Sequence, residues 1–160
     1  MAVTIPTVPE IAQHYKATSL PSVALFWSSG GTSGDWLSIS NAYAQRPTVQ
    51  RLTQDLLWKD DWYKQYINHQ THTADEIKEF WSRASVAMAT MTSGVAYVLL
   101  PSSNHPVEWL PTSTWAQVEY PILTESGSGV TKICRVNYNH ALNEFTTPFR
   151  VWPEVDTEQC

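Results

Sequence analysis

The clearest periodic pattern of apolar residues begins after Thr73. Thr73 and Glu76 have the spacing of a capping box, in which each side chain accepts a hydrogen bond from a backbone N–H of the first helical turn. Apolar residues then recur at three- and four-residue intervals on one helical face, at Ile77, Phe80, Trp81, Ala84, Met88 and Met91. The pattern predicts a helix that ends at Gly94.

Shorter helical patterns precede this helix. Thr7 and Glu10 predict the start of a short helix, and Asp35 is expected to cap another helix that extends to Tyr43. Pro47 is expected in the first turn of a third helix, since its missing N–H is not needed there. The apolar positions of that helix are Val49, Leu52, Leu56 and Leu57. The first part of the chain is therefore predicted to be mostly helical.

The last third of the chain has the pattern of strands. Residues 95–100 are continuously apolar between Gly94 and Pro101, as expected of a strand that is buried on both faces. Three further strands are predicted at residues 115–120, 130–136 and 149–152. We predict an α+β fold in which a helical bundle, residues 1–92, packs beside a small, mostly parallel sheet, residues 94–152.

Length, charge and cysteine content narrow the class of protein. The 160 residues are expected to form a single domain. A formal net charge of −5 argues against a nucleic-acid partner, and no apolar run is long enough to cross a membrane. The first residues lack the pattern of a signal peptide. Two cysteines are too few for a disulfide framework, so Cys134 is expected to be a small buried residue and Cys160 to have no role.

Two tryptophans stand beside hydroxyl-bearing residues. Trp81 and Ser85 are four residues apart in the predicted helix, so an aromatic surface and a hydroxyl share one helical face. Trp27 is followed by Ser28 and a Gly-rich loop, after an apolar run whose secondary structure the pattern leaves open. Simpler interpretations also fit, with Trp81 in the hydrophobic core and Trp27 at an ordinary entry to a loop.

A carboxylate follows a cluster of hydroxyls near the second predicted strand. Ser113 and Thr114 directly precede that strand. Side chains alternate along a strand, so Trp115, Gln117 and Glu119 are expected to project from the same face. An edge strand with one solvated face is the simpler interpretation.

Together these segments resemble the ADP-ribosyl cyclase and NAD glycohydrolase family. Residues 79–85, followed by the run at 94–100, resemble the family's helix with a Phe-Trp pair and a Ser four residues after the Trp, which leads into an apolar strand. Residues 113–119 resemble its Ser-Thr-Phe segment, whose Glu lies four residues beyond the Phe, and residues 26–28 resemble its first Trp-Ser motif. The resemblance covers residues 22–137.

The resemblance implies an enzyme that cleaves the nicotinamide–ribose bond, with NAD as substrate and no cofactor or metal. Glu119 would be the catalytic carboxylate, and Trp27 and Trp81 would hold the nicotinamide end. Further contacts to the ribose and phosphates would come from Ser28, Ser85, Ser113, Thr114 and Trp115, the last of which stands where the family has Phe. Loss of nicotinamide leaves positive charge on the ribose, which a buried carboxylate would stabilise.

Two departures from the family affect the expected product and location. The family carries a second acidic residue, for which Gln50 is the nearest match, so Gln50 would be a further substrate contact. We therefore expect hydrolysis to ADP-ribose with some cyclic ADP-ribose. The family's disulfides are missing, which indicates a chain that need not fold in an oxidising compartment. Because unrestrained NAD cleavage would harm a host cell, we expect a domain delivered by a larger secreted toxin, or a cytoplasmic enzyme, held by an immunity or inhibitor protein.

Two other functions remain open at this point. A protein ADP-ribosyltransferase breaks the same bond, but it usually has a second acid near the catalytic Glu, and Gln117 stands two residues before Glu119. A non-enzymatic module that binds nucleotides or carbohydrates would use exposed tryptophans instead.

Overall fold

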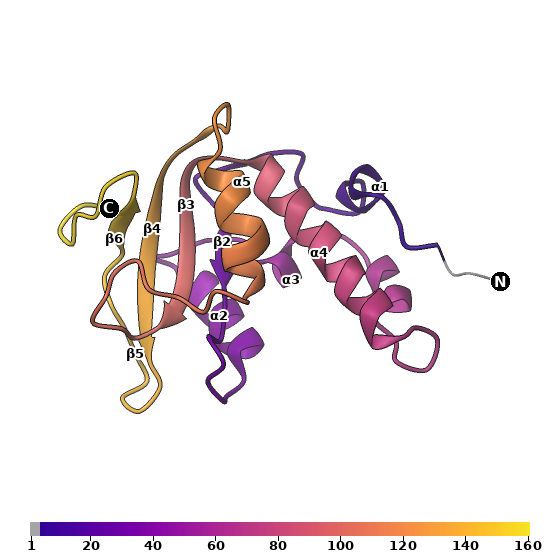
Figure 1. The fold of residues 1–160 in the computed structure, drawn as a ribbon, viewed down its shortest axis with the longest axis horizontal. Helices are drawn as coiled ribbons and strands as arrows, with labels where there is room; N and C mark the ends of the chain where they lie inside the picture. Colours follow the sequence, from indigo (N-terminus) through magenta and orange to yellow (C-terminus); the bar gives the residue numbers. More distant parts are fainter. Residues whose placement is uncertain (1–3) are drawn as a thin grey trace.

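The computed structural model describes residues 4–160 and shows a mixed six-stranded sheet flanked by helices (Figure 1). The strands are β1 (Leu20–Pro21), β2 (Leu25–Trp27), β3 (Thr92–Pro101), β4 (Val130–Asn139), β5 (Glu144–Phe145) and β6 (Phe149–Trp152). The helical elements are α1 (Val8–Ala12), α2 (Trp36–Ala44), α3 (Gln54–Leu57), the 3₁₀ turn η1 (Trp62–Tyr66), α4 (Ala74–Met91), the π-helical turn η2 (Trp115–Glu119) and α5 (Tyr120–Thr124). Within the described residues, none of the helices has the length and apolar character that a membrane crossing requires.

Strand β3 lies at the centre of the sheet. Strands β1 and β2 both pair with it in parallel, and β4 pairs with it in parallel along the opposite edge. Strands β5 and β6 pair with β4 in antiparallel orientation. The predicted α+β fold with a mostly parallel sheet is confirmed. However, β1 and β2 come from the part of the chain that was expected to be mostly helical. Strands of two and three residues carry too little periodicity to be recognised.

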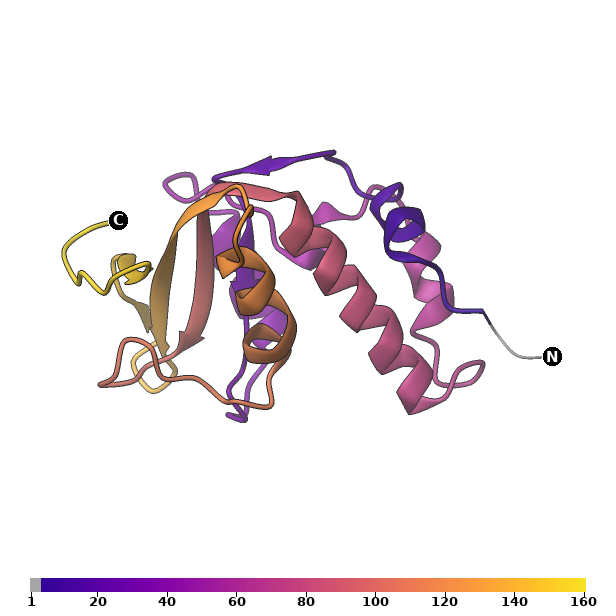
Figure 2. The same ribbon diagram turned by 45° about the horizontal axis from the view of Figure 1, so that its top comes forward.

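The sheet has two different apolar faces, since side chains alternate along β3. Ala96, Val98 and Leu100 face the larger core, which includes residues of α1, α3, α4, η2 and α5. We call this side the α4 face. Leu99 faces a smaller core that includes Trp36 and other residues of α2, and we call this side the α2 face. Figure 2 shows α4 and α5 side by side, as in Figure 1.

The predicted long helix is present as α4. Thr73 Oγ1 accepts a hydrogen bond from the Glu76 N–H at 3.2 Å, and Glu76 Oε1 accepts one from the Thr73 N–H at 2.8 Å. The helix ends at Met91, because Thr92 has an extended backbone and begins β3. The predicted helices after Thr7 and Asp35 are also present, as α1 and α2.

The predicted strand at residues 115–120 is wrong, because this segment forms η2 and the start of α5. Strands β3 and β4 are adjacent and parallel, so the chain must cross from the end of one to the start of the other, and a helix makes such a crossover. In the helix, Trp115 and Glu119 are buried and Gln117 is exposed. The shared face proposed for all three side chains therefore does not exist.

The predicted helix after Pro47 is also wrong. The chain turns back after α2, with Gln50 in the left-handed region (φ 50°) and the Arg51 N–H bonded to the Ala44 carbonyl at 2.8 Å. Leu52 then runs alongside β2, through its N–H bond to Val23 and the bond that its carbonyl accepts from Leu25. Only the four residues of α3 are helical.

A disulfide joins Cys134 of β4 to Cys160. Cys134 is fully buried, as the apolar run around it predicted. Cys160, which was expected to have no role, instead ties the last residue to the sheet. Two cysteines that are 26 residues apart leave the pairing undetermined in the sequence, because only the return of β6 along β4 brings them together.

Candidate active site

Glu119 lies at the end of η2 on the α4 face, with its side chain 7% exposed. Pro121 explains why the turn is π-helical. It has no N–H to donate to the Gln117 carbonyl, and its ring crowds that carbonyl. The Tyr120 N–H bonds instead to the Trp115 carbonyl, five residues back. The widened turn contacts both α4 and β2, and it holds the carboxyl of Glu119 inside the protein.

The carboxyl of Glu119 interacts with the hydroxyl of Ser85 on α4. Burial raises the pKa of Glu119 to about 8, and the hydrogen bond with Ser85 lowers it. Trp81 lies one helical turn before Ser85, and its half-buried ring packs against the larger core. The structure therefore brings together Glu119 and Ser85 of the predicted site, with Trp81 one turn away.

A buried tyrosine extends this cluster. The Tyr15 hydroxyl donates to the Ala84 carbonyl at 2.9 Å and accepts a hydrogen bond from Gln54 Nε2. Burial raises the pKa of Tyr15 far above its usual value, the Gln54 hydrogen bond lowers it, and the nearby charge of Glu119 raises it. Gln54 Oε1 is buried and has no hydrogen-bond partner among residues 4–160. A polar network thus joins the segment after α1 to α3 and α4 beside the carboxyl group.

Tyr15 and Gln54 are missing from the site that the sequence predicted. Gln50, which was matched to the family's second acidic residue, lies exposed in the loop after α2 and does not belong to this network. The only local signal is Thr53, whose side chain caps α3 and so predicts a helical turn that would carry Gln54. Nothing in the sequence around Tyr15 indicates that it meets the Glu119 site.

Trp115 is fully buried on the inner side of η2. The centroid of its ring lies 5.9 Å from that of Phe26 and 5.8 Å from that of Trp109. Its indole N–H is buried and has no hydrogen-bond partner in the described part of the chain. Trp115 therefore packs η2 against β2, and a direct contact with a ligand stays a prediction.

Trp27 is the last residue of β2 and is half-buried. Its side chain packs against the core of the α2 face, whereas Phe26, on the other side of the strand, meets Trp115. Ser28 follows, with its N–H bonded to the Leu99 carbonyl at 3.2 Å. Trp27 and Trp81 thus pack against different cores, and Trp27 is near the Glu119 site only through the contact of β2 with η2.

Ser113 and Thr114 stand at the start of the η2 helix. Ser113 Oγ accepts a hydrogen bond from the Ala116 N–H at 3.1 Å and donates one to the Leu110 carbonyl at 2.7 Å. Ser113 therefore caps the helix that carries Glu119, while the Thr114 side chain is exposed. Ser113 thus sets the start of η2, and the contact of Ser113 and Thr114 with a ligand stays a prediction.

A cavity of about 350 Å³ opens at the carboxyl end of β3. It is lined by residues 100–103 and 108–111 together with Gly30 and Arg135, so Glu119 is not part of its wall. Trp109 links this cavity to η2, because Trp109 lines the cavity and its ring contacts that of Trp115. Parallel sheets commonly bind ligands beyond the carboxyl ends of their strands.

The cluster around Glu119 offers one carboxyl, two hydroxyls and one amide in a largely buried setting. A carboxyl in such a place, once ionised, stabilises a positive charge that develops beside it, since little water screens it. Over the described residues, no three His, Cys, Asp or Glu side chains gather in the way that a metal ion would require.

Comparisons with known proteins give the family and a similar fold. The sequence profile of the ADP-ribosyl cyclase family matches residues 58–142, more than half of the chain. A search of curated proteins found no match. The fold is similar to the crystal structure of Aplysia cyclase complexed with substrate NGD and product cGDPR, with a TM-score of 0.54 and 17% sequence identity. The likeness covers 82% of this chain and 55% of that one, so this chain spans about half of that structure's length.

Proposed function

Because the chain belongs to the ADP-ribosyl cyclase family, we propose that it cleaves the nicotinamide–ribose bond of NAD to release nicotinamide and ADP-ribose. One observation carries the proposal: the buried carboxyl of Glu119 meets Ser85, one turn from the aromatic surface of Trp81. The substrate of the structural neighbour, NGD, supports a dinucleotide as the substrate class.

The chemistry needs little more than a negative charge in the right place. When the bond between the ribose C1′ and the nicotinamide nitrogen breaks, its electron pair leaves with the nitrogen, so nicotinamide departs neutral and the ribose becomes cationic. The ionised Glu119 stabilises that cation. Water then adds to C1′ and loses a proton, which yields ADP-ribose.

The protonation state of Glu119 is coupled to substrate in this mechanism. Its pKa of about 8 leaves the carboxyl mostly protonated at neutral pH in the free protein. The nicotinamide ring of NAD is cationic, and a positive charge beside a carboxyl favours ionisation. Binding of NAD therefore releases the proton and forms the ion pair that the cleavage step uses.

The remaining residues hold the substrate. Trp81 offers a ring face to the cationic nicotinamide, an attraction of roughly 0.5–2 kcal/mol. Trp27 and Ser28 approach the dinucleotide from the end of β2, and the hydroxyls of Ser85, Ser113 and Thr114 serve the ribose and phosphates. No cofactor takes part, and NAD is the substrate.

We assign hydrolysis as the main reaction, with cyclic ADP-ribose as a minor product. The polar residue that joins the Glu119 cluster from α3 is the amide Gln54, not a second carboxylate. A neutral amide holds a ribose hydroxyl by hydrogen bonds but adds no charge to steer the cationic intermediate.

Incubation of the protein with NAD, followed by chromatography of the products, tests this function. Nicotinamide and ADP-ribose in equal amounts, formed without any added protein target, are expected. Nicotinamide release only when a protein acceptor is present would identify an ADP-ribosyltransferase. Binding of NAD without release of nicotinamide would identify a binding module.

We further propose that the protein acts as a delivered or secreted toxin domain with an immunity or inhibitor partner. Unrestrained NAD cleavage would harm the cell that makes the protein. The Cys134–Cys160 disulfide supports passage through an oxidising compartment, since disulfides are rare in the cytosol. Expression in a bacterial cytosol should lower cellular NAD and arrest growth, and Glu119→Gln should remove both effects. Normal growth and NAD content with soluble, active protein would contradict the toxin role.

A further inference from the structure

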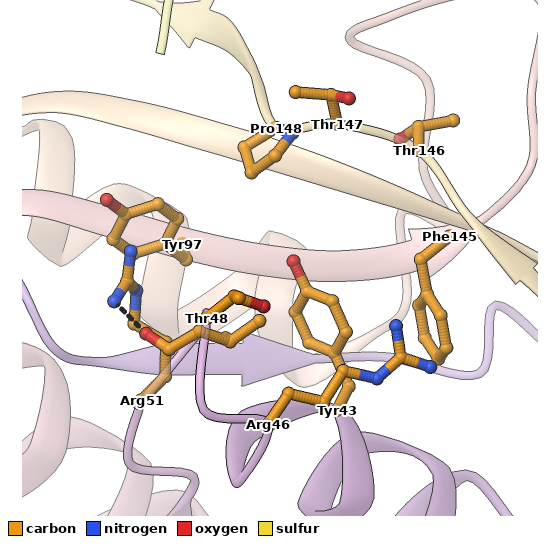
Figure 3. A pocket seen from close by; sticks show the side chains of 10 residues that line it. Tyr43, Arg46, Thr48, Arg51, Tyr97, Phe145, Thr146, Thr147 and Pro148 are labelled. Atoms are coloured by element: carbon orange, nitrogen blue, oxygen red, sulfur yellow. Dashed lines mark hydrogen bonds between the residues drawn. The ribbon is translucent and has the colours of Figure 1, made fainter.

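A second pocket, on the α2 face of the sheet, has the residues of an anion site. Its volume is about 270 Å³. The loop after α2 provides Arg46, Thr48 and Arg51, and the segment after β5 provides Thr146 and Thr147 (Figure 3). No Asp or Glu lines the pocket. Two cations and three threonine hydroxyls thus line one hollow in a chain whose net charge is −5.

The two guanidinium groups lie on aromatic rings that fix their positions. Arg51 lies over the Tyr97 ring, 4.0 Å from its centroid, and Arg46 lies over the Phe145 ring at 4.6 Å. Figure 3 shows both arginines and the Tyr43 hydroxyl at the same hollow. The cation–π contacts hold the charges in place, and the Arg46 guanidinium makes no hydrogen bond within residues 4–160 that would occupy its edge.

Neither arginine has a carboxylate partner among the ion pairs of residues 4–160. Arg51 Nη1 donates to the backbone carbonyls of Val49 and Gln50, and Arg51 Nε is buried with no partner in the same part of the chain. The positive charges of both arginines lower the pKa of Tyr43, while its burial has the larger effect and raises it. Both charges therefore act at the Tyr43 hydroxyl in the pocket wall.

The pocket is separate from the Glu119 site. Tyr43, Tyr97 and Phe145 belong to the core of the α2 face, and Glu119 lies on the α4 face, behind the sheet. Its position thus gives the pocket no part in cleavage at Glu119. The tight loop of residues 46–51, with the left-handed Gln50, presents both arginines on this side.

We propose that this pocket binds a small phosphate-bearing anion. Guanidinium groups match the geometry of phosphate oxygens and form charge-assisted hydrogen bonds with them. Thr48, Thr146 and Thr147 add neutral donors. The volume is below the usual range of about 300–1,000 Å³ for drug-sized ligands, which fits a phosphate or diphosphate group better than a whole dinucleotide.

Isothermal titration of the full chain with inorganic pyrophosphate tests the proposal. We expect binding by the wild-type protein, weakened about tenfold or more by Arg51→Gln and by Arg46→Gln, since each removes charge-assisted hydrogen bonds. Arg46 is exposed, so its variant keeps the test valid if Arg51→Gln destabilises the fold. Lys78→Gln, which removes the same charge from the exposed side of α4, is the matched control and should change the affinity less than twofold.

Two further measurements distinguish the kind of phosphate ligand and separate this pocket from the Glu119 site. Titration with inorganic phosphate and with ADP shows whether one phosphate, a diphosphate or a nucleotide is preferred. Glu119→Gln should bind pyrophosphate as the wild type does, whether or not the protein cleaves NAD. No binding by the wild type at millimolar pyrophosphate, an equal loss in Lys78→Gln, or loss of binding in Glu119→Gln would each overturn the proposal.

Discussion

The hydroxyl of Ser85 lies against the buried carboxyl of Glu119 and lowers a pKa that burial has raised to about 8. The two residues are 34 positions apart in sequence, on α4 and η2, and they meet because the crossover helix packs against α4. Burial favours the neutral form of Glu119, and the hydrogen bond from Ser85 favours its ionised form. The proposed chemistry depends on that balance.

Replacement of Glu119 by Gln should lower NAD turnover at least roughly 10²-fold, because the amide carries no charge to stabilise the cationic ribose. Initial rates of nicotinamide release measure the effect, with circular dichroism as the control for folding. The matched control is Glu125→Gln, which removes an exposed carboxylate just after α5. Turnover of Glu119→Gln close to wild type would remove Glu119 from its role.

The dependence of kcat/KM on pH should follow the ionisation of free Glu119. Because the pKa is about 8, the carboxyl is protonated at low pH and carries no charge to stabilise the cationic ribose. The value of kcat/KM should therefore rise with pH and reach half its plateau near pH 8. The profile of kcat, which reports the enzyme–substrate complex, should have its midpoint at lower pH, because the cationic ring favours ionisation. Coincident midpoints would contradict the coupling between substrate and proton.

The same pKa makes stability depend on pH. Below the unfolded pKa of Glu119 the carboxyl is protonated in both states, and its contribution to stability is fully present. As the pH rises towards 8, the unfolded chain ionises first, so that contribution is lost. The free energy of unfolding should therefore fall between about pH 4.5 and 8, by up to about 5 kcal/mol, in the wild type relative to Glu119→Gln. Urea unfolding at several pH values measures it, and a constant difference would contradict the raised pKa.

Replacement of Ser85 by Ala should move the midpoint of the kcat/KM profile to higher pH, since the hydrogen bond that lowers the pKa of Glu119 is lost. At pH 7 the rate should fall between about twofold and tenfold. Ser82→Ala, on the same helix, is the matched control and should leave the midpoint unchanged. A lower rate with an unmoved midpoint in Ser85→Ala would indicate a purely structural role.

Removal of the Cys134–Cys160 disulfide should destabilise the protein. Closing a loop of 26 residues is worth about 3.5 kcal/mol by its effect on the unfolded chain, or a fall of roughly 10 °C in Tm. Cys160→Ser is the cleaner variant, because Cys134 is buried. Reduction should lower the Tm of the wild type and leave that of Cys160→Ser unchanged. Equal effects of the reductant on both proteins would show that the bridge does not form.

The parts of the fold that the sequence predicted are those with strong local signals. The capping box at Thr73 and Glu76 fixed the start of α4, and the apolar run after Gly94 marked β3 as a buried strand. Both depend on interactions within a few residues. The position of Ser85 on the same helical face as Trp81 followed from helical spacing alone.

The rest depends on contacts between distant segments. A carboxylate on a short apolar stretch that ends at a proline fits a strand or a helix, and only the parallel pairing of β3 with β4 requires a helical crossover. Gln54 is linked to the Glu119 cluster through Tyr15, which the segment after α1 brings there, and no local pattern contains that contact. The disulfide likewise depends on the return of β6 along β4.

The π-helical turn makes the position of Glu119 depend on the number of residues between Trp115 and Glu119, and not only on which residues they are. Each residue of a regular helix rotates the next side chain by about 100° around the axis. Loss of one residue between Trp115 and Glu119 would restore a regular turn and swing the carboxyl away from α4, with every functional side chain still present. The surplus residue that Pro121 imposes is therefore a geometric constraint on the length of this segment, independent of its composition.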